Sequence, residues 1–258
     1  MPRILLHPGF HKTGTSSIQH FLWVNRDRIA ETSTLYMLRH MKPVTDLCHA
    51  YSKTGNPLVL MDMVDRLDAV FANHPFDGRD VLISCEALSG HLPGWPGVAD
   101  YAAAPVIWDF VVGYLRDKLA TDDVQIIATT REAEPWLWSA YRHHLQGHRL
   151  TDDWETFRTA HAAAARFDAV MTEFDYPVTL LPLEQSKQHP QGAGGALLAA
   201  FGFDALDAFD TVRPGNIGPT QAIADEFLSL NRSPLPDADL RAAKEALAAQ
   251  HGVGHWNR

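Results

Sequence analysis

Short apolar runs alternate with amphipathic stretches along most of the chain. Runs typical of buried strands lie within residues 2–9, 79–85, 124–130 and 176–182. Apolar residues at helical spacing predict helices near residues 14–30, 57–73, 105–120, 134–146, 152–173, 219–231 and 237–249. This alternation predicts an α/β fold, a three-layer sandwich with a central, mostly parallel sheet and helices on both faces.

The length of 258 residues suits a single domain over residues 1–258. From about residue 184 the pattern is less regular, and the segment QHPQGAGG at 188–195 is predicted to be a loop. The pattern shows no internal repeat or low-complexity tract, so no second domain is required.

The composition and the net charge limit the cellular location and the binding partners that we expect. There is no signal-like apolar core after a basic start, and no apolar stretch of about 18 residues, so we expect a cytoplasmic protein without an integral membrane segment. Cys48 and Cys85 lack the paired spacing of a zinc site and are expected to be reduced thiols. The net charge of −9 argues against nucleic acid as a partner, so any anionic cofactor needs a local pocket.

The first strand is followed by HPGFHKTGTSSIQH, residues 7–20. A nucleotide P-loop frame fits from Gly9 to Ser16, but Thr15 stands where that frame has lysine, and the loop's lysine is Lys12. Backbone N–H groups and the start of a helix favour an anion at such a loop. Lys12 adds a full charge, and further hydroxyl or backbone donors are Thr13, Gly14, Thr15, Ser16 and Ser17. ATP or GTP hydrolysis is disfavoured, because the P-loop lysine and a strand ending in Asp are both missing.

Two later segments carry arginines suited to phosphate. Arg131 ends the strand at 124–130, at the sheet edge where open α/β proteins bind ligands, and Ser139 follows eight residues later. Arg213 and Gly215 lie in the loop RPGNIG, which ends at Gly218. The alternatives are a surface ion pair of Arg131 with a nearby glutamate and an exposed Arg213 without a ligand.

The three segments, in this order, resemble the signatures of sulfotransferases that use 3′-phosphoadenosine 5′-phosphosulfate (PAPS), bacterial members included. The resemblance implies a P-loop NTPase-like sulfotransferase fold, with PAPS as donor and adenosine 3′,5′-bisphosphate as product. It implies that residues 11–17, His11 and Lys12 among them, bind the 5′-phosphosulfate. It assigns the 3′-phosphate to Arg131 and Ser139. It also implies that Arg213 and Gly215, in the C-terminal loop, bind the cofactor.

The expected reaction is transfer of a sulfuryl group to a hydroxyl or amine of an unidentified acceptor, either a small molecule or a glycan. The Lys-x-x-His element of cytosolic small-molecule members is absent, whereas Glu86 follows a strand as the base does in glycan-modifying and many bacterial members. Glu86 is therefore the expected base, with His11 as the rival. Lys12 and the loop N–H groups would stabilise the bridging oxygen, so no metal is required.

Several alternatives stay open at this point. The same scaffold suits a small-molecule kinase, and a non-catalytic nucleotide-binding protein is a third class. The histidines at positions 143, 144 and 148 lack a cysteine or carboxylate to complete a metal site. Tryptophans that could line an acceptor pocket, or else belong to the core, are Trp95, Trp108, Trp136, Trp138 and Trp256. The sequence does not predict the oligomeric state.

Overall fold

The computed structural model describes residues 1–172, 174–212 and 218–253, and in them five strands form one sheet. The strands, in the order β2-β3-β1-β4-β5, are all parallel to their neighbours. Their bounds are β1 (Ile4–His7), β2 (Ser33–Met37), β3 (Asp80–Ser84), β4 (Val124–Thr130) and β5 (Val178–Pro182). The predicted α/β class is confirmed, with a described sheet that is entirely rather than mostly parallel.

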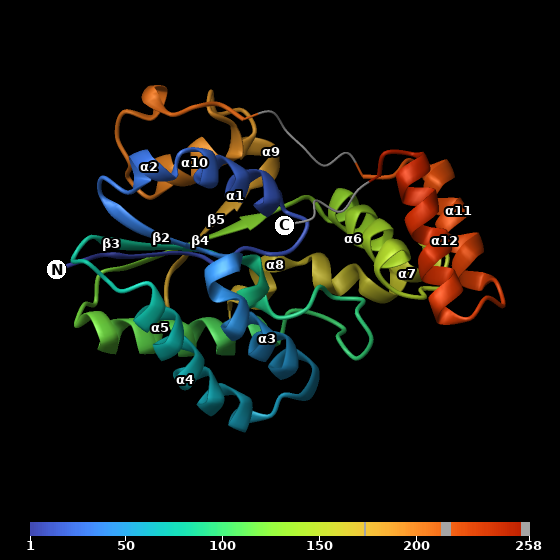
Figure 1. The fold of residues 1–258 in the computed structure, drawn as a ribbon, viewed down its shortest axis with the longest axis horizontal. Helices are drawn as coiled ribbons and strands as arrows, with labels where there is room; N and C mark the ends of the chain where they lie inside the picture. Colours follow the sequence, from blue (N-terminus) through green and yellow to red (C-terminus); the bar gives the residue numbers. More distant parts are fainter. Residues whose placement is uncertain (173, 213–217, 254–258) are drawn as a thin grey trace.

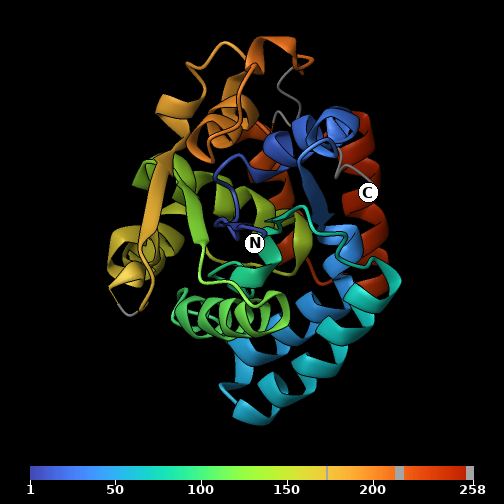
Figure 2. The same cartoon turned by 90° about the vertical axis from the view of Figure 1, so that its left-hand side faces the viewer.

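Helices cover both faces of the sheet (Figure 1), and the view turned by 90° keeps the same two layers (Figure 2). One layer contains α1 (Thr15–Val24), α2 (Arg26–Ile29), α9 (Leu183–Ser186) and α10 (Gly192–Ala200). The other contains α3 (Leu38–Thr54), α4 (Pro57–Asn73), α5 (Ala103–Leu119) and α8 (Phe167–Met171). This arrangement matches the predicted three layers.

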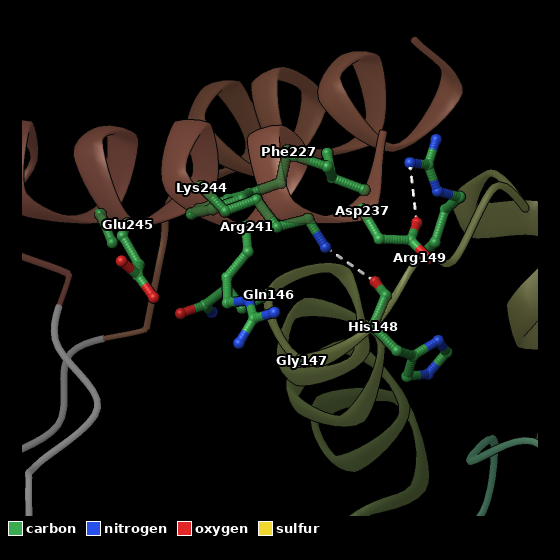
Figure 3. A pocket seen from close by; sticks show the side chains of 11 residues that line it. Gln146, Gly147, His148, Arg149, Phe227, Asp237, Arg241, Lys244 and Glu245 are labelled. Atoms are coloured by element: carbon green, nitrogen blue, oxygen red, sulfur yellow. Dashed lines mark hydrogen bonds and ion pairs between the residues drawn. The ribbon is translucent and has the colours of Figure 1, made fainter. Parts of the chain in front are cut away.

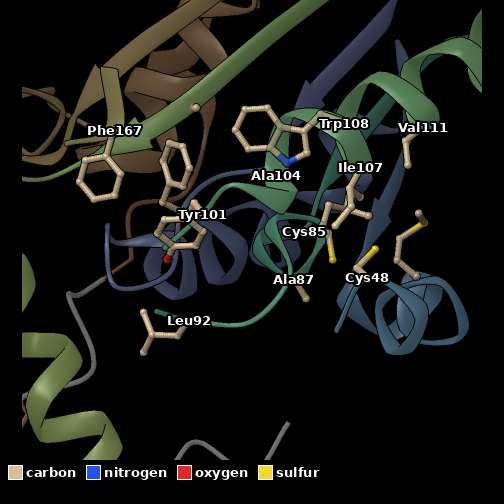
Figure 4. Packing of buried hydrophobic residues seen from close by; sticks show 14 of the residues in the cluster. Cys48, Cys85, Ala87, Leu92, Tyr101, Ala104, Ile107, Trp108, Val111 and Phe167 are labelled. Carbon is tan, nitrogen blue, oxygen red and sulfur yellow. The ribbon is translucent and has the colours of Figure 1, made fainter. Parts of the chain in front are cut away.

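Alternating side chains of the central strands supply the two cores. In β1, Leu5 packs with the α1 and α10 side, whereas Ile4 and Leu6 pack with the α3 and α5 side. The larger core includes the buried aromatic residues Tyr101 and Trp108 (Figure 4). Because successive strand residues point to opposite faces, these continuous apolar runs are what a sheet covered on both sides requires.

A further group of helices lies beyond the carboxyl edge of the sheet (Figure 1). It comprises α6 (Ala133–Gly147), α7 (Trp154–His161), α11 (Gln221–Arg232) and α12 (Asp237–Gln250). Helix α11 packs against both α6 and α12. The short 3₁₀ turns are η1 (Glu86–Ser89), η2 (Ala162–Ala165) and η3 (Leu206–Ala208).

Several predicted elements need correction. Strand β2 and helix α3 were not predicted, and the single helix expected over 152–173 is divided into α7, η2 and α8. The predicted loop at 188–195 is wrong in its second half, where α10 begins at Gly192. A Cβ at Gly194 would lie 2.4 Å from the Phe21 ring, so the absence of a side chain at Gly194 lets α10 pack closely on α1. Among the described helices, none is long and apolar enough to cross a membrane.

The sheet topology brings the predicted motifs to one edge. Strands β3, β1 and β4 are neighbours, and their carboxyl ends lie side by side because they run parallel. The chain leaves β1 through α1 on one face and reaches β4 through α5 on the other. Open α/β sheets bind ligands where such connections diverge. The residues after these strands are the glycine-rich loop, Glu86 and Arg131.

Candidate functional site

The loop between β1 and α1 has an unusual backbone. Gly9, Lys12 and Gly14 all have positive φ angles, at 61°, 66° and 92°. A positive φ is easy for glycine but rare for a lysine, because the Cβ atom crowds the backbone. Gly14 also faces α9 so closely that a Cβ there would lie 2.5 Å from Leu183 Cδ1. The strained lysine backbone marks this loop as a candidate functional segment.

A chain of buried hydrogen bonds holds the loop to the sheet. The ring of His7 contacts the Ser84 hydroxyl through Nδ1 at 2.8 Å and the Thr129 hydroxyl through Nε2 at 3.4 Å. The Thr129 hydroxyl in turn lies 2.7 Å from that of Thr13, which donates to the Phe10 carbonyl. One consistent direction runs from Ser84 through His7 and Thr129 to Thr13. The Thr13 hydroxyl therefore donates its proton to a carbonyl of the loop itself, and not to a bound anion.

This network makes His7 a structural residue with a measurable pH signature. We expect His7→Gln to lower the free energy of unfolding at pH 7, because buried hydroxyls lose a well-shaped partner. Burial lowers the pKa of His7 to about 3. The unfolded chain, with a pKa of about 6.5, binds more protons below that value, so wild-type stability falls as the pH drops, by up to about 1.4 kcal/mol per unit.

Urea unfolding of both proteins from pH 7 to pH 4 checks this expectation. The stability difference between wild type and His7→Gln should narrow steadily as the pH falls. Other buried histidines are present in both proteins and cancel in the comparison, and His20→Gln is the control for losing an exposed imidazole. A difference that stays constant across the range would show that His7 does not titrate as a buried base.

Helix α1 begins directly after the loop without a side-chain cap. Its N-cap is Gly14, which has no side chain to accept a hydrogen bond from the first turn. The first N–H groups of a helix have no partner within the helix and attract anions. The predicted donors Thr15, Ser16 and Ser17 form this first turn, in which Thr15 is buried. The loop and helix start together can therefore surround an anion with backbone donors.

His11 and Lys12 lie in the loop between β1 and α1, where two buried aromatic residues form hydrogen bonds with the backbone of His11. The His11 amide donates to the Tyr101 hydroxyl at 3.1 Å, and the His11 carbonyl accepts from Trp136 Nε1 at 2.8 Å. The Tyr101 hydroxyl also lies 3.3 Å from His11 Nδ1. Burial lowers the pKa of His144 on α6 to about 3, and the charges of His148, His161 and, as the smallest effect, Lys12 lower it further.

Glu86 is a buried carboxylate at the start of η1, two residues after β3. Its side chain is 5% exposed and accepts a hydrogen bond from Gln19 Nε2 of α1. Burial raises the pKa of Tyr101 well above its usual value, and the charge of Glu86 adds to this effect. Tyr101 also contacts His11, so one candidate base contacts this tyrosine and the charge of the other acts on it. A buried carboxylate near the loop has the surroundings expected of a general base.

Arg131 connects the end of β4 to the loop. Its Nη1 donates to the Lys12 carbonyl at 3.2 Å, while its Nε is buried without a partner among the described residues. Burial lowers the pKa of Arg131, against an opposing effect from the charge of Glu184. Ser139 lies two turns into α6 and is partly buried. Within the described ranges Arg131 forms no ion pair with Glu132 or Glu134, and Glu134 pairs with Arg158 instead.

Arg142 is a neighbouring charge that sequence reasoning missed. It lies on α6, three residues after Ser139, and its Nε is also buried without a partner in the described part of the chain. Burial lowers the pKa of Arg142, and the charge of Arg131 lowers it further. Gln19 and Tyr101 were missed as well. Their only sequence signal is a polar residue one turn after Thr15 and a tyrosine before a helix, which neither spacing nor composition makes specific.

The remaining residues named from the sequence belong to the third motif, the tryptophans and the histidine cluster. Arg213, Gly215 and Trp256 lie outside the described residues, so the third motif is represented by Gly218 alone. Trp108 and Trp136 are fully buried core residues, whereas Trp95 and Trp138 are partly exposed. Trp95 stacks on His91, with ring centroids 5.0 Å apart. His148 Nε2 contacts His144 Nδ1 at 3.0 Å, and no group of three or more potential metal ligands occurs in the described part of the chain.

A separate pocket of 540 Å³ lies between the end of α6 and helices α11 and α12 (Figure 3). The buried Lys244 donates to the His148 carbonyl at 2.8 Å, and Arg149 pairs with Asp237 at 3.1 Å. Burial lowers the pKa of Lys244 to about 8, with a further effect from Arg149. The ammonium at the carboxyl end of α6 is favoured by the helix dipole. These contacts tie the α11–α12 pair to α6.

The candidate site thus combines an uncapped helix start, a lysine, a buried carboxylate and two half-buried arginines around the carboxyl ends of three neighbouring strands. Two of the three predicted motifs are brought into direct contact by the fold. Comparisons of the chain with protein-family models, curated proteins and solved structures found no significant match.

Proposed function

We propose that this protein is a PAPS-dependent sulfotransferase with a P-loop-like sulfotransferase fold. The observation that carries the proposal is the contact between Arg131 Nη1 and the Lys12 carbonyl. These residues are 119 positions apart and belong to the two segments that resemble the 5′-phosphosulfate and 3′-phosphate signatures. An entirely parallel sheet, with the loop at the end of its central strand, supports the fold assignment.

The residues present fit a donor with two anionic ends. The uncapped start of α1 offers backbone N–H groups at one position, and the buried Nε of Arg131, which has no partner among the described residues, offers a donor at the other. Buried polar groups are normally hydrogen-bonded, so an orphaned guanidinium nitrogen indicates a missing acceptor. A phosphate oxygen is an acceptor that a guanidinium binds well.

PAPS supplies an activated sulfuryl group, and the residues of the chain supply the remaining chemistry. Lys12 places a positive charge where negative charge develops on the departing oxygen, and in many enzymes such electrostatic stabilisation contributes more to the rate than any other effect. Glu86 accepts the proton of the attacking hydroxyl, and Gln19 holds its carboxylate in place. His11 remains the second candidate for the base, because its imidazole lies in the same loop as Lys12 and contacts the buried Tyr101 hydroxyl. The acceptor is a small molecule or a glycan.

Thermal unfolding with a panel of nucleotides tests the proposal. Adenosine 3′,5′-bisphosphate, 5′-AMP, ATP and GTP are compared in EDTA and in Mg²⁺. A ligand at 100 times its Kd stabilises by about 2.7 kcal/mol, which corresponds to a rise in Tm of roughly 5–10 °C for a protein of this size. We expect that rise for the bisphosphate in EDTA and a smaller one for 5′-AMP. A shift seen only with ATP and Mg²⁺ would favour the kinase alternative.

A further inference from the structure

Arg142 is held at the predicted 3′-phosphate end of the site by several contacts. Its Nη1 donates to the Pro219 carbonyl at 2.6 Å, and its guanidinium lies 5.3 Å from the centre of the Trp138 ring. A Cβ at Gly218 would lie 3.0 Å from Arg142 Cζ, so the absence of a side chain there leaves room for the guanidinium. These contacts position the guanidinium and still leave its buried Nε without an acceptor among the described residues.

No acid group forms an ion pair with Arg131 or Arg142 in the described part of the chain, and the charge of Glu184 acts on Arg131 only at longer range. The carbonyl acceptors of the two arginines are neutral. The two guanidinium groups are half-buried, and each has a pKa lowered chiefly by burial. Glu184 offsets part of the charge of Arg131, whereas among the described residues the only charge that shifts the pKa of Arg142 is that of Arg131, so an anion bound beside the pair would be stabilising.

The helix geometry places Ser139 with this pair. Residues three apart on a helix lie on the same face, so Ser139 and Arg142 are neighbours on the surface of α6. Long helical side chains lean towards the helix start, and Arg131 lies just before the start of α6. Ser139 is therefore a hydroxyl donor on the same helix face as Arg142.

We propose that Arg142 joins Arg131 in binding the ribose 3′-phosphate and that it makes donor binding depend on that phosphate. The inference rests on the proposed function, which supplies a ligand with a 3′-phosphate. Arg142 lies outside the motif residues that suggested this function. A phosphate monoester carries close to two negative charges at neutral pH, so two arginines match its charge where one does not.

Titration of adenosine 3′,5′-bisphosphate and 5′-AMP into wild type and variants in EDTA tests the inference. We expect Arg142→Gln to weaken bisphosphate binding by about 10- to 100-fold, the range for a lost charged hydrogen bond, and 5′-AMP binding by less than about 3-fold. Arg142→Lys should give an intermediate loss, because lysine keeps the charge without the planar fork. Arg166→Gln, at an exposed arginine just before α8, is the charge-matched control and should change neither affinity.

Melting of the ligand-free proteins separates this role from a purely structural one. We expect the Tm of Arg142→Gln to stay close to that of wild type, because removing the repulsion from Arg131 offsets the lost contacts with Pro219 and Trp138. A structural arginine would instead lower the Tm and leave the ratio of bisphosphate to 5′-AMP affinity unchanged, and that result overturns the inference.

Failure of the inference and failure of the proposed function give different results. If wild type prefers the bisphosphate and Arg142→Gln keeps the full preference, Arg142 does not bind the phosphate and the proposed function stands. If wild type binds both nucleotides equally, the proposed function fails and the inference fails with it. Should Arg142→Gln not fold, Arg142→Lys decides, since an unchanged ratio in that variant together with a lowered Tm assigns Arg142 a structural role.

Discussion

Replacement of Lys12 by alanine should reduce sulfuryl transfer by about 10²- to 10³-fold, because the reaction loses the charge that stabilises the departing oxygen. The fold should survive the change. The loop path depends on Gly9, Gly14 and the hydrogen-bond chain from His7 to Thr13, and none of these contacts uses the Lys12 side chain. Single-turnover transfer from PAPS and thermal unfolding without ligand are the two measurements.

Two further variants at this position serve as controls. Lys12→Arg keeps the charge and should retain part of the activity. Lys12→Gly should be as inactive as Lys12→Ala but more stable than it by about 1–2 kcal/mol, because glycine adopts the positive φ of 66° without strain. A large loss of ligand-free stability in Lys12→Ala, or transfer at near the wild-type rate, would assign Lys12 a structural role instead.

Replacement of Glu86 by glutamine should leave donor binding intact and lower the transfer rate by roughly 10²- to 10⁴-fold, the usual contribution of a positioned general base. The amide keeps the shape of the carboxylate and can still form a hydrogen bond with Gln19, so the packing around η1 should persist. It cannot accept the proton of the attacking hydroxyl. Single-turnover rates with PAPS across a range of pH check the expectation.

His11→Asn is the companion variant, because His11 is the rival base. Loss of the true base should remove the rise in rate with pH that its deprotonation produces in wild type. We expect Glu86→Gln to remove that rise and His11→Asn to keep it at a reduced rate. If Glu86→Gln turns over near the wild-type rate while His11→Asn is inactive, the base is the histidine.

Local sequence patterns predict the part of the fold that depends on local structure. Strand β4 has the predicted bounds 124–130, and α4 the predicted bounds 57–73, because each combines a clear period with turn residues at its ends. Strand β2 is only five residues long and α3 contains Pro43, a residue that disfavours helix interiors. Strand β2 is stabilised by pairing with β3, and helix α3 by packing against α4. No local sequence pattern reveals either contact.

In the candidate site, too, some residues could be predicted from local sequence patterns and others could not. The loop at Lys12 and the arginine at the end of β4 could be identified as candidates, since both follow directly after strands that the sequence predicts. Arg142, Gln19 and Tyr101 could not, because their significance lies in contacts between segments that are far apart in the sequence. Helix α10 could not be predicted either. Its glycines are typical of a loop in the sequence, but in the folded chain Gly194 allows close contact with α1.

The most direct test of the central claim is a transfer assay that offers both donor types together. Wild-type protein is incubated with sulfur-labelled PAPS and γ-phosphorus-labelled ATP, with pooled saccharide and phenol acceptors, in EDTA or in Mg²⁺. We predict that only the sulfur label reaches acceptors, equally in both buffers, and that Lys12→Ala transfers neither label. Transfer of the phosphorus label that disappears in EDTA, with the sulfur label left in its donor, would contradict the account.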